Sequence, residues 1–145
     1  MDVVALAPQG VRPLRQAVLR PHERVEDLVW PGDEASEALH AGARDGNGAI
    51  VGVATVVPEP YPRDPRSADW RLRGMATEPE ARGRGVGRAL LAACLAHASA
   101  RGARRVWCSA RIGALRFYER AGFTVESEAF DVPGIGPHVY MTLAL

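Results

Sequence analysis

The apolar positions of this chain fall into short runs separated by turn residues. These runs predict strands at residues 3–7, 38–44, 49–57, 70–77, 104–109, 123–128 and 138–145. Longer patterned segments predict helices at 14–20, 86–101 and 113–121, and the acidic stretch 22–37 predicts a short helix or a loop. The resulting order, β-α-α-β-β-β-α-β-α-β-β, indicates a mixed α/β sandwich and not a doubly wound parallel sheet.

Turn residues set the expected boundaries of these elements. Pro21 should stop the first helix, and Gly102 should cap the helix that begins near residue 86. The sequence Asp-Gly-Asn-Gly at 45–48 predicts a hairpin turn. Residues 58–68 contain four prolines and predict a loop, and residues 131–137 are rich in turn formers.

A glycine-rich turn stands directly before the helix predicted at 86–101. Residues 79–91 read PEARGRGVGRALL, so glycines allow close backbone approach just where a helix presents its unpaired N–H groups. Backbone amides and the positive end of the helix dipole bind phosphate in such places. Arginine side chains at 82, 84 and 88 add positive charge. The segment therefore predicts a phosphate-binding loop.

The spacing distinguishes between the known kinds of phosphate loop. A Walker A loop requires lysine, which is absent from the whole chain. The dinucleotide-binding pattern Gly-x-Gly-x-x-Gly matches poorly, because Arg88 occupies the position of its third glycine. The remaining pattern, Arg-x-x-Gly-x-Gly, is met by Arg82, Gly85 and Gly87. It resembles the coenzyme A pyrophosphate loop of the GNAT superfamily of N-acetyltransferases.

Two further segments strengthen this resemblance. Residues 114–123, ALRFYERAGF, are similar to the second signature of that superfamily, and residues 73–80, RGMATEPE, to the strand before its phosphate loop. Together the similar segments cover residues 72–123. The resemblance implies one acetyltransferase domain over residues 1–145, with a mostly antiparallel central sheet flanked by helices. It also implies acetyl-coenzyme A as the acyl donor. No metal is expected, because no cluster of His, Cys, Asp or Glu has the spacing of metal ligands.

The resemblance assigns roles to particular residues. Tyr118 matches the tyrosine that acts as general acid toward the departing sulfur; by its position on an apolar stripe it could instead be a core residue. Arg111 replaces the asparagine that is usual in the family, and could reach a phosphate. The expected donor-binding residues are Met75, Ala76, Thr77, Arg82, Gly83, Arg84, Gly85, Val86, Gly87, Arg88 and Arg111. No general base is evident; among four histidines His138 is the best placed, and the proton could also leave through water.

Composition narrows the classes of partner. The net charge is +1, but residues 82–120 hold nine arginines and one acid, which suits a ligand with several phosphates better than nucleic acid. No apolar run approaches membrane-span length and the first residues do not resemble a signal peptide, so we expect a cytoplasmic protein without membrane contact. Cys94 and Cys108 are expected to be buried thiols.

The acceptor is the least constrained part of the hypothesis. Residues 22–37 carry six acids and one arginine, which would favour a cationic amine if they lined the acceptor site; they could equally be a solvated surface. The leading hypothesis is direct acetyl transfer to a primary amine of a small molecule or peptide, by a protein that could form a homodimer. The alternative is an acyl-coenzyme A-binding sensor or interaction domain without turnover.

Overall fold

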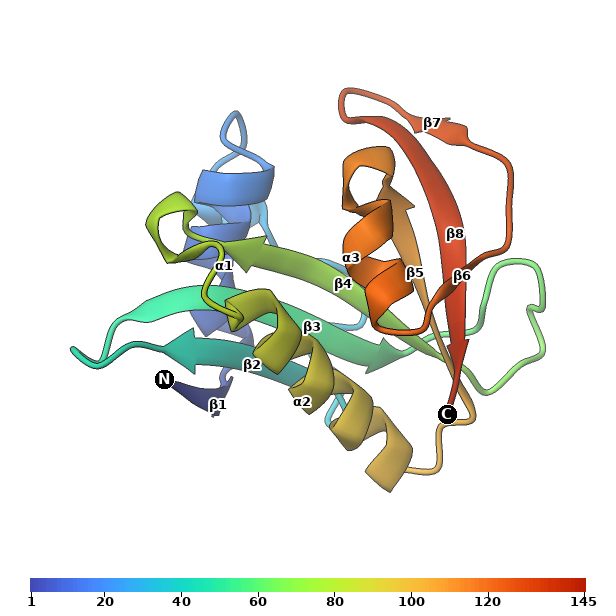
Figure 1. The fold of residues 1–145 in the computed structure, drawn as a ribbon, viewed down its shortest axis with the longest axis horizontal. Helices are drawn as coiled ribbons and strands as arrows, with labels where there is room; N and C mark the ends of the chain where they lie inside the picture. The colour runs from blue at the N-terminus through green and yellow to red at the C-terminus, as the bar shows by residue number, and fades with distance from the viewer.

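The computed structural model describes all 145 residues, which form one open sheet with helices on both faces (Figure 1). The strands are β1 (Asp2–Leu6), β2 (Leu39–Arg44), β3 (Ile50–Pro58), β4 (Trp70–Thr77), β5 (Arg105–Arg111), β6 (Thr124–Val125), β7 (Phe130–Val132) and β8 (Gly136–Ala144). The α-helices are α1 (Arg12–Leu14), α2 (Val86–Ala100) and α3 (Leu115–Arg120). A π-helix, Arg15–Leu19, continues α1, and short 3₁₀ turns cover Pro8–Val11, Val25–Asp27, Pro79–Ala81 and Ile112–Ala114.

The sheet has the strand order β1-β2-β3-β4-β5-β8-β6, and β7 also pairs with β8. All strand pairs are antiparallel except β4 with β5. That parallel pair is joined only at two positions, Trp70 with Val106 and Arg71 with Trp107. Beyond them the two strands separate, so the backbone groups that β4 directs toward β5 have no strand partner there.

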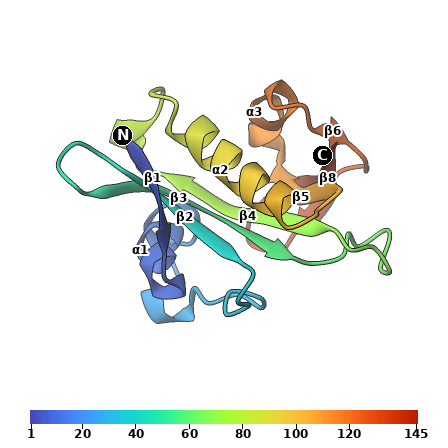
Figure 2. The ribbon, with the colours of Figure 1, turned by 90° about the horizontal axis from the view of Figure 1, so that it is seen from below.

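The helices divide between the two faces of the sheet (Figure 2). Helices α2 and α3 cover one face, and α1 with the π-helix covers the other. Helix α2 buries a stripe of Val86, Leu90, Leu91, Cys94 and Ala98 in the main hydrophobic core. A small second cluster of Val11, Leu14, Val53 and Ala76 lies beneath α1.

A bulge in β4 decides which of its side chains face each side. The register against β3 shifts between Val53 and Thr55, and Gly74 has a φ of +66°, which a glycine adopts without strain. Before the bulge, Leu72 faces the main core; after it, Met75 does so and Ala76 joins the cluster beneath α1. The extra residue therefore reverses the alternation along the strand just where β4 leaves β5.

Most predicted elements are confirmed. Strand β4 and the start of α2 occur where they were expected, Gly102 follows α2 with a φ of +83°, and residues 45–48 form the β2–β3 turn. The mixed, mostly antiparallel sheet flanked by helices is confirmed as well. None of the helices is long and apolar enough to span a lipid bilayer.

Three predicted elements differ from the structure. The helix expected at 14–20 is a three-residue α-helix followed by a π-helix. The acidic stretch 22–37, for which a short helix or a loop was expected, agrees with that expectation: it is a loop with one 3₁₀ turn, Val25–Asp27. The strand expected at 123–128 shrinks to two residues, while the turn-rich segment at 131–137 contains part of β7. The two differences near the C-terminus have one cause. Both β6 and β7 pair with β8, and strand propensity alone does not predict which residues of the segment form those pairs.

Candidate functional site

A cavity of about 730 Å³ opens where β4 and β5 separate. Its lining includes Cys108 and Ala110 from one face of β5 and Ser109 and Arg111 from the other, so the cavity reaches both faces of the sheet through the gap. We call the part on the side of α2 and α3 the donor half, and the part on the side of α1 the acceptor half.

The glycine-rich turn borders the donor half with a row of free amides. The amide of Ala89 is the first in α2 to bond within the helix, to the carbonyl of Gly85, and the amides of residues 83–88 donate no backbone hydrogen bond. Gly83 and Gly85 have φ values of +76° and +80°, and a Cβ added at either would meet nothing within 4 Å. The turn is therefore an open concavity of backbone donors at the start of a 15-residue helix.

The arginines of this turn retain their charge for a ligand. Arg82, Arg84 and Arg88 are exposed, and none forms an ion pair within the protein. Arg82 also lines the cavity, and its Nε donates to the carbonyl of Thr77 at 3.3 Å. Three unpaired guanidiniums around free amides suit a pyrophosphate group. The residues present thus fit a donor of the coenzyme A type.

Tyr118 lies between the cavity and the main core. It is 8% exposed, and its ring meets Phe117 and Phe123 in edge-to-face contacts. Its hydroxyl makes no hydrogen bond to a protein group, and burial, followed by the nearby thiols of Cys108 and Cys94, raises the pKa of the phenol above its usual value. The hydroxyl therefore keeps its proton and remains a hydrogen-bond donor next to the cavity.

Two arginines converge at the acceptor half. Arg20 Nη1 and Arg111 Nη2 donate to the same carbonyl, that of Leu19, at 3.0 Å and 3.4 Å. Burial and then the charge of Arg111 lower the pKa of Arg20, whose one ion pair is with Glu23 at 3.5 Å. Arg111 has no ion pair. Two like charges with so little compensation form a site that an anion would stabilise.

His138 stands opposite Arg111 on the neighbouring strand and lines the same cavity. Its Nδ1 lies 2.9 Å from the carbonyl oxygen of Gly136. Because a carbonyl can only accept, Nδ1 carries the proton in the neutral ring, and Nε2 presents a lone pair. Nε2 makes no hydrogen bond within the protein. The geometry therefore leaves one ring nitrogen able to accept a proton.

The acidic segment 22–37 contributes no acid to the cavity lining, so of the two alternatives left open by the sequence, the one in which its acids line the acceptor site is not met here. The cavity lining contains no aspartate or glutamate and includes five arginines: Arg20, Arg71, Arg73, Arg82 and Arg111. From residues 22–37, only Trp30 and Pro31 reach the cavity. Most of the acids are used in ion pairs with neighbouring arginines, so their charge is compensated before any ligand arrives.

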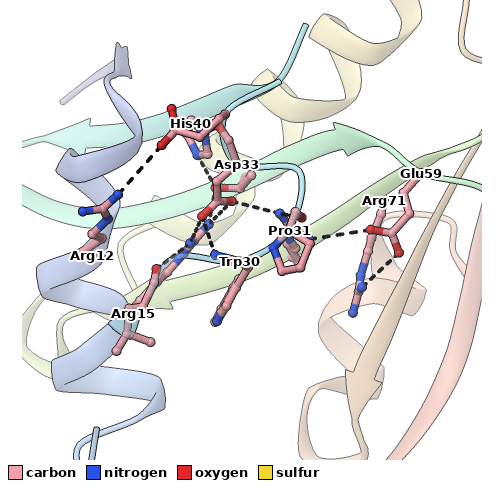
Figure 3. A network of polar contacts seen from close by, with 12 residues as sticks. Arg12, Arg15, Trp30, Pro31, Asp33, His40, Glu59 and Arg71 are labelled. Atoms are coloured by element: carbon pink, nitrogen blue, oxygen red, sulfur yellow. Dashed lines mark hydrogen bonds and ion pairs between the residues drawn. The ribbon is translucent and has the colours of Figure 1, made fainter. Parts of the chain in front are cut away.

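Asp33 is the centre of a buried polar network behind the acceptor half (Figure 3). Its carboxylate accepts hydrogen bonds from Arg15 at 2.6 Å, from Arg73 at 2.9 Å and from the backbone N–H of Trp30 at 3.0 Å. Arg15, which is fully buried, also donates to the hydroxyl of Thr55 at 2.9 Å. The network joins the π-helix, β3, β4 and the loop after Leu28, and thereby fixes the wall of the cavity.

The predicted site residues do not all reach the cavity. Those that line it are Met75, Thr77, Arg82, Val86, Gly87, Arg111 and Tyr118. Gly83, Arg84, Gly85 and Arg88 lie on the exposed turn and first helical turn beside it. The side chain of Ala76 packs beneath α1 because of the bulge at Gly74, which leaves only its backbone for a ligand in the gap.

Sequence reasoning missed part of the acceptor half. Arg20 and Trp30 lie in segments without a motif, and Arg73 lies in the segment 73–80 but had no predicted role there. Only the folding of the π-helix and the following loop onto β4 brings the three together. A small signal was present, because Trp30 is the one Phe, Tyr or Trp residue in the acidic stretch 22–37.

Comparison with known proteins is consistent with this geometry. The sequence model of the acetyltransferase (GNAT) family matches residues 11–123. The uncharacterized N-acetyltransferase YitI of Bacillus subtilis (strain 168) is 30% identical over 141 residues, which are 97% of this chain and 94% of that protein.

Solved structures share the fold at lower identity. An aminoglycoside 6′-N-acetyltransferase complexed with coenzyme A has a TM-score of 0.75 at 14% identity, covering 99% of this chain and 97% of that one. ElaA of Escherichia coli has a TM-score of 0.75 at 19% identity, with 97% of both chains covered. A GCN5-related N-acetyltransferase from Kribbella flavida has a TM-score of 0.74 at 22% identity, with 99% and 97% covered.

Proposed function

Because this chain belongs to the acetyltransferase (GNAT) family, we propose that it transfers an acetyl group from acetyl-coenzyme A to the primary amine of a small molecule that also carries an anionic group. One observation carries the acceptor part of the proposal. The cavity is continuous from the glycine-rich turn to Arg20 and Arg111, and its lining holds arginines but no acid.

The donor half would hold acetyl-coenzyme A through backbone and arginine contacts. The free amides of residues 83–88 and the unpaired Arg82, Arg84 and Arg88 would bind its phosphates. The unpaired backbone of β4 beyond Arg71 offers N–H donors along the gap, where one of them can stabilise negative charge on a carbonyl oxygen. When bound, the donor supplies an activated thioester carbonyl.

The acceptor half would select the amine by its anionic partner group. The guanidiniums of Arg20 and Arg111 meet at the carbonyl of Leu19 and can turn from it toward a carboxylate. Arg71 and Arg73 already pair with Glu59 and Asp33, so they contribute less free charge. A carboxylate-bearing amine is therefore favoured over a polyamine, which the same arginines would repel.

Two side chains would assist the transfer, one by accepting a proton and one by stabilising the leaving group. Nε2 of His138 accepts a proton from the amine, since Nδ1 is committed to Gly136. Tyr118 would donate a hydrogen bond to the sulfur, which leaves as the thiolate of coenzyme A and takes its proton from water, because the raised pKa of Tyr118 disfavours a tyrosinate. Replacing Tyr118 by phenylalanine should lower kcat while acetyl-coenzyme A still binds; an unchanged kcat would exclude this role.

The test is a thiol-release assay with acetyl-coenzyme A and three classes of amine. We expect turnover with carboxylate-bearing amines such as glycine, less with ethanolamine, and least with spermidine. In Arg111→Ala, KM for the carboxylate-bearing amine should rise about tenfold or more, as for loss of a hydrogen bond to a charged group.

The matched control is Arg104→Ala, which removes an exposed arginine next to the opposite end of β5. This variant should behave like the wild type. Preference for spermidine, or equal effects of the two variants, would contradict the anionic acceptor. Binding of acetyl-coenzyme A in calorimetry without turnover on any amine would instead favour an acyl-coenzyme A-binding sensor.

A further inference from the structure

Trp30 closes the acceptor half next to the two converging arginines. Its indole lines the cavity, with the guanidinium carbon of Arg20 at 6.0 Å and that of Arg73 at 5.7 Å from the ring centroid. It is the only tryptophan that lines the cavity. Any acceptor whose anionic group reaches Arg20 must therefore lie near this ring.

The indole is held firmly from behind. The guanidinium of Arg15, which is fully buried, lies 4.0 Å from the ring centroid, a distance typical of a cation–π contact. The backbone N–H of Trp30 donates to Asp33, whose carboxylate is itself held by Arg15 and Arg73. Figure 3 shows Trp30 next to Arg15 and Asp33 in this network. A shift of the ring would break its contact with a guanidinium that a buried ion pair holds in place, and the hydrogen bond to Asp33 fixes the backbone that carries the ring.

The bulge in β4 holds the ring from another side. A Cβ built on Gly74 would lie 3.1 Å from Cζ3 of Trp30 and 3.1 Å from Nε of Arg15. The indole therefore rests directly against the strand, in space that any other residue at position 74 would fill. The positive φ of Gly74 serves the same arrangement, because it lets the backbone approach the ring.

We propose that Trp30 is the specificity-determining residue of the acceptor half and limits the acceptor to compact carboxylate-bearing amines. The inference rests on the proposed function and adds an upper limit on size to it. Because Arg15 and the backbone at Gly74 contact the indole and Asp33 holds the backbone of Trp30, the wall cannot move aside for a bulky substituent, as an exposed and flexible side chain could. Removal of the ring should open the site toward Arg15 and Gly74.

The test measures kcat/KM for glycine and for phenylalanine in the wild type and in Trp30→Ala. The ratio of kcat/KM for phenylalanine to kcat/KM for glycine should rise about tenfold or more in the variant, because a change in the apolar volume of a pocket changes discrimination between substrates by about this factor. The ratio is insensitive to a partial loss of folded enzyme, which lowers both values equally. Trp30→Phe should give an intermediate ratio.

Val29→Ala is the matched control, because Val29 is 40% exposed, adjacent in sequence and absent from the cavity lining. Its ratio should equal that of the wild type. An unchanged ratio in Trp30→Ala, in an enzyme that still binds acetyl-coenzyme A by calorimetry, would overturn the inference and leave the proposed function intact. Absence of turnover by the wild type with every amine would overturn the proposed function, and the inference with it.

Discussion

His138 illustrates how a backbone carbonyl can decide which ring nitrogen is available for chemistry. The carbonyl of Gly136, a residue with φ of +119°, accepts from Nδ1, and the ring of Phe130 stacks on the imidazole at a centroid distance of 6.3 Å and an interplanar angle of 28°. Phe130 is also the residue paired with His138 across the β7–β8 hairpin. Hydrogen bond and stacking together hold the ring in one orientation.

We expect His138→Gln to lower kcat by roughly 100-fold or more, the usual contribution of a positioned general base. Glutamine keeps a polar side chain but cannot accept a proton at neutral pH. Steady-state kinetics with a carboxylate-bearing amine would measure the loss, and calorimetry should give an unchanged affinity for acetyl-coenzyme A. His97→Gln is the control, since His97 lies on α2 outside the cavity. Equal kcat values for His138→Gln and the wild type would exclude His138 as the base.

At this scale the sequence predicts local chemistry better than assembled chemistry. The turn at 82–88 could be recognised because its donors are consecutive in sequence. Arg20, Trp30 and Arg73 span more than 50 residues and share a cavity only after folding, so no spacing rule connects them. His138 stood out as the best-placed histidine, but its fixed tautomer depends on a hydrogen bond that the sequence does not reveal.

At the scale of elements, the start of α2 is built around glycine. Gly85 is the N-terminal cap with a φ of +80° and no capping side chain, and Gly87 faces Phe117 of α3, where an added Cβ would lie 3.2 Å from the ring. The first glycine supplies a backbone conformation, and the second permits close packing of two helices. Each requirement excludes a side chain for a different reason.

We expect Gly85→Ala to weaken binding of acetyl-coenzyme A by about 1–3 kcal/mol, the usual strain of a non-glycine residue in a left-handed conformation. A Cβ there would meet nothing within 4 Å, so the effect comes from backbone strain and not from a clash. Calorimetric titration measures it. Gly46→Ala, at an open turn position without positive φ, should leave the affinity unchanged. Unchanged binding in Gly85→Ala would place the donor's phosphates elsewhere.

The elements that the sequence predicted well are those with strong local signals. The strand at 70–77 and the helix from residue 86 combine a clear apolar pattern with a glycine turn between them. The sequence of Arg15–Leu19 predicts an ordinary α-helix, because a π-helix has no simple sequence signature. Its shape follows from tertiary contacts, chiefly the burial of the Arg15 guanidinium on Asp33 and Thr55.

At the scale of the whole molecule, the Asp33 network links the π-helix to strands β2, β3 and β4. It ties the π-helix to β3 through Thr55 and to β4 through Arg73, and His40 of β2 donates or accepts at Thr55 with an Nδ1 to Oγ1 distance of 2.8 Å. Asp33 itself is 2% exposed. A buried carboxylate is tolerated only because cationic and neutral donors surround it, so stability depends on its charge.

We expect the stability of the protein to decline as the pH falls from about 4 to about 2. Burial raises the pKa of Asp33, but hydrogen bonds from Arg15, Trp30 and Arg73 outweigh it and lower the pKa from 3.8 to about 2. The folded state therefore favours the carboxylate and gains roughly 2 kcal/mol of stability from it. This stabilisation is fully present above the pKa of Asp33 in the unfolded chain and is lost as the pH falls through its pKa in the folded protein.

Urea unfolding followed from pH 7 to pH 2 measures this dependence. Asp33→Asn should be less stable by about 3–5 kcal/mol at pH 7, as for removal of one partner from a buried ion pair. Its free energy of unfolding should fall less than that of the wild type when the pH is lowered. Asp2→Asn is the control, because that carboxylate is 72% exposed. An acid decline as steep in Asp33→Asn as in the wild type would assign it to other carboxylates.

The pairing of Arg111 with His138 across β5 and β8 has a consequence for regiochemistry. Directly opposed residues on neighbouring antiparallel strands hold their Cβ atoms about 5 Å apart, and neither strand can slide without breaking the ladder. The group proposed to bind the anion and the group proposed to deprotonate the amine are therefore directly opposite each other on two paired strands. An acceptor must present its two functional groups with a matching number of bonds between them, so the enzyme would distinguish positional isomers of the same amino acid.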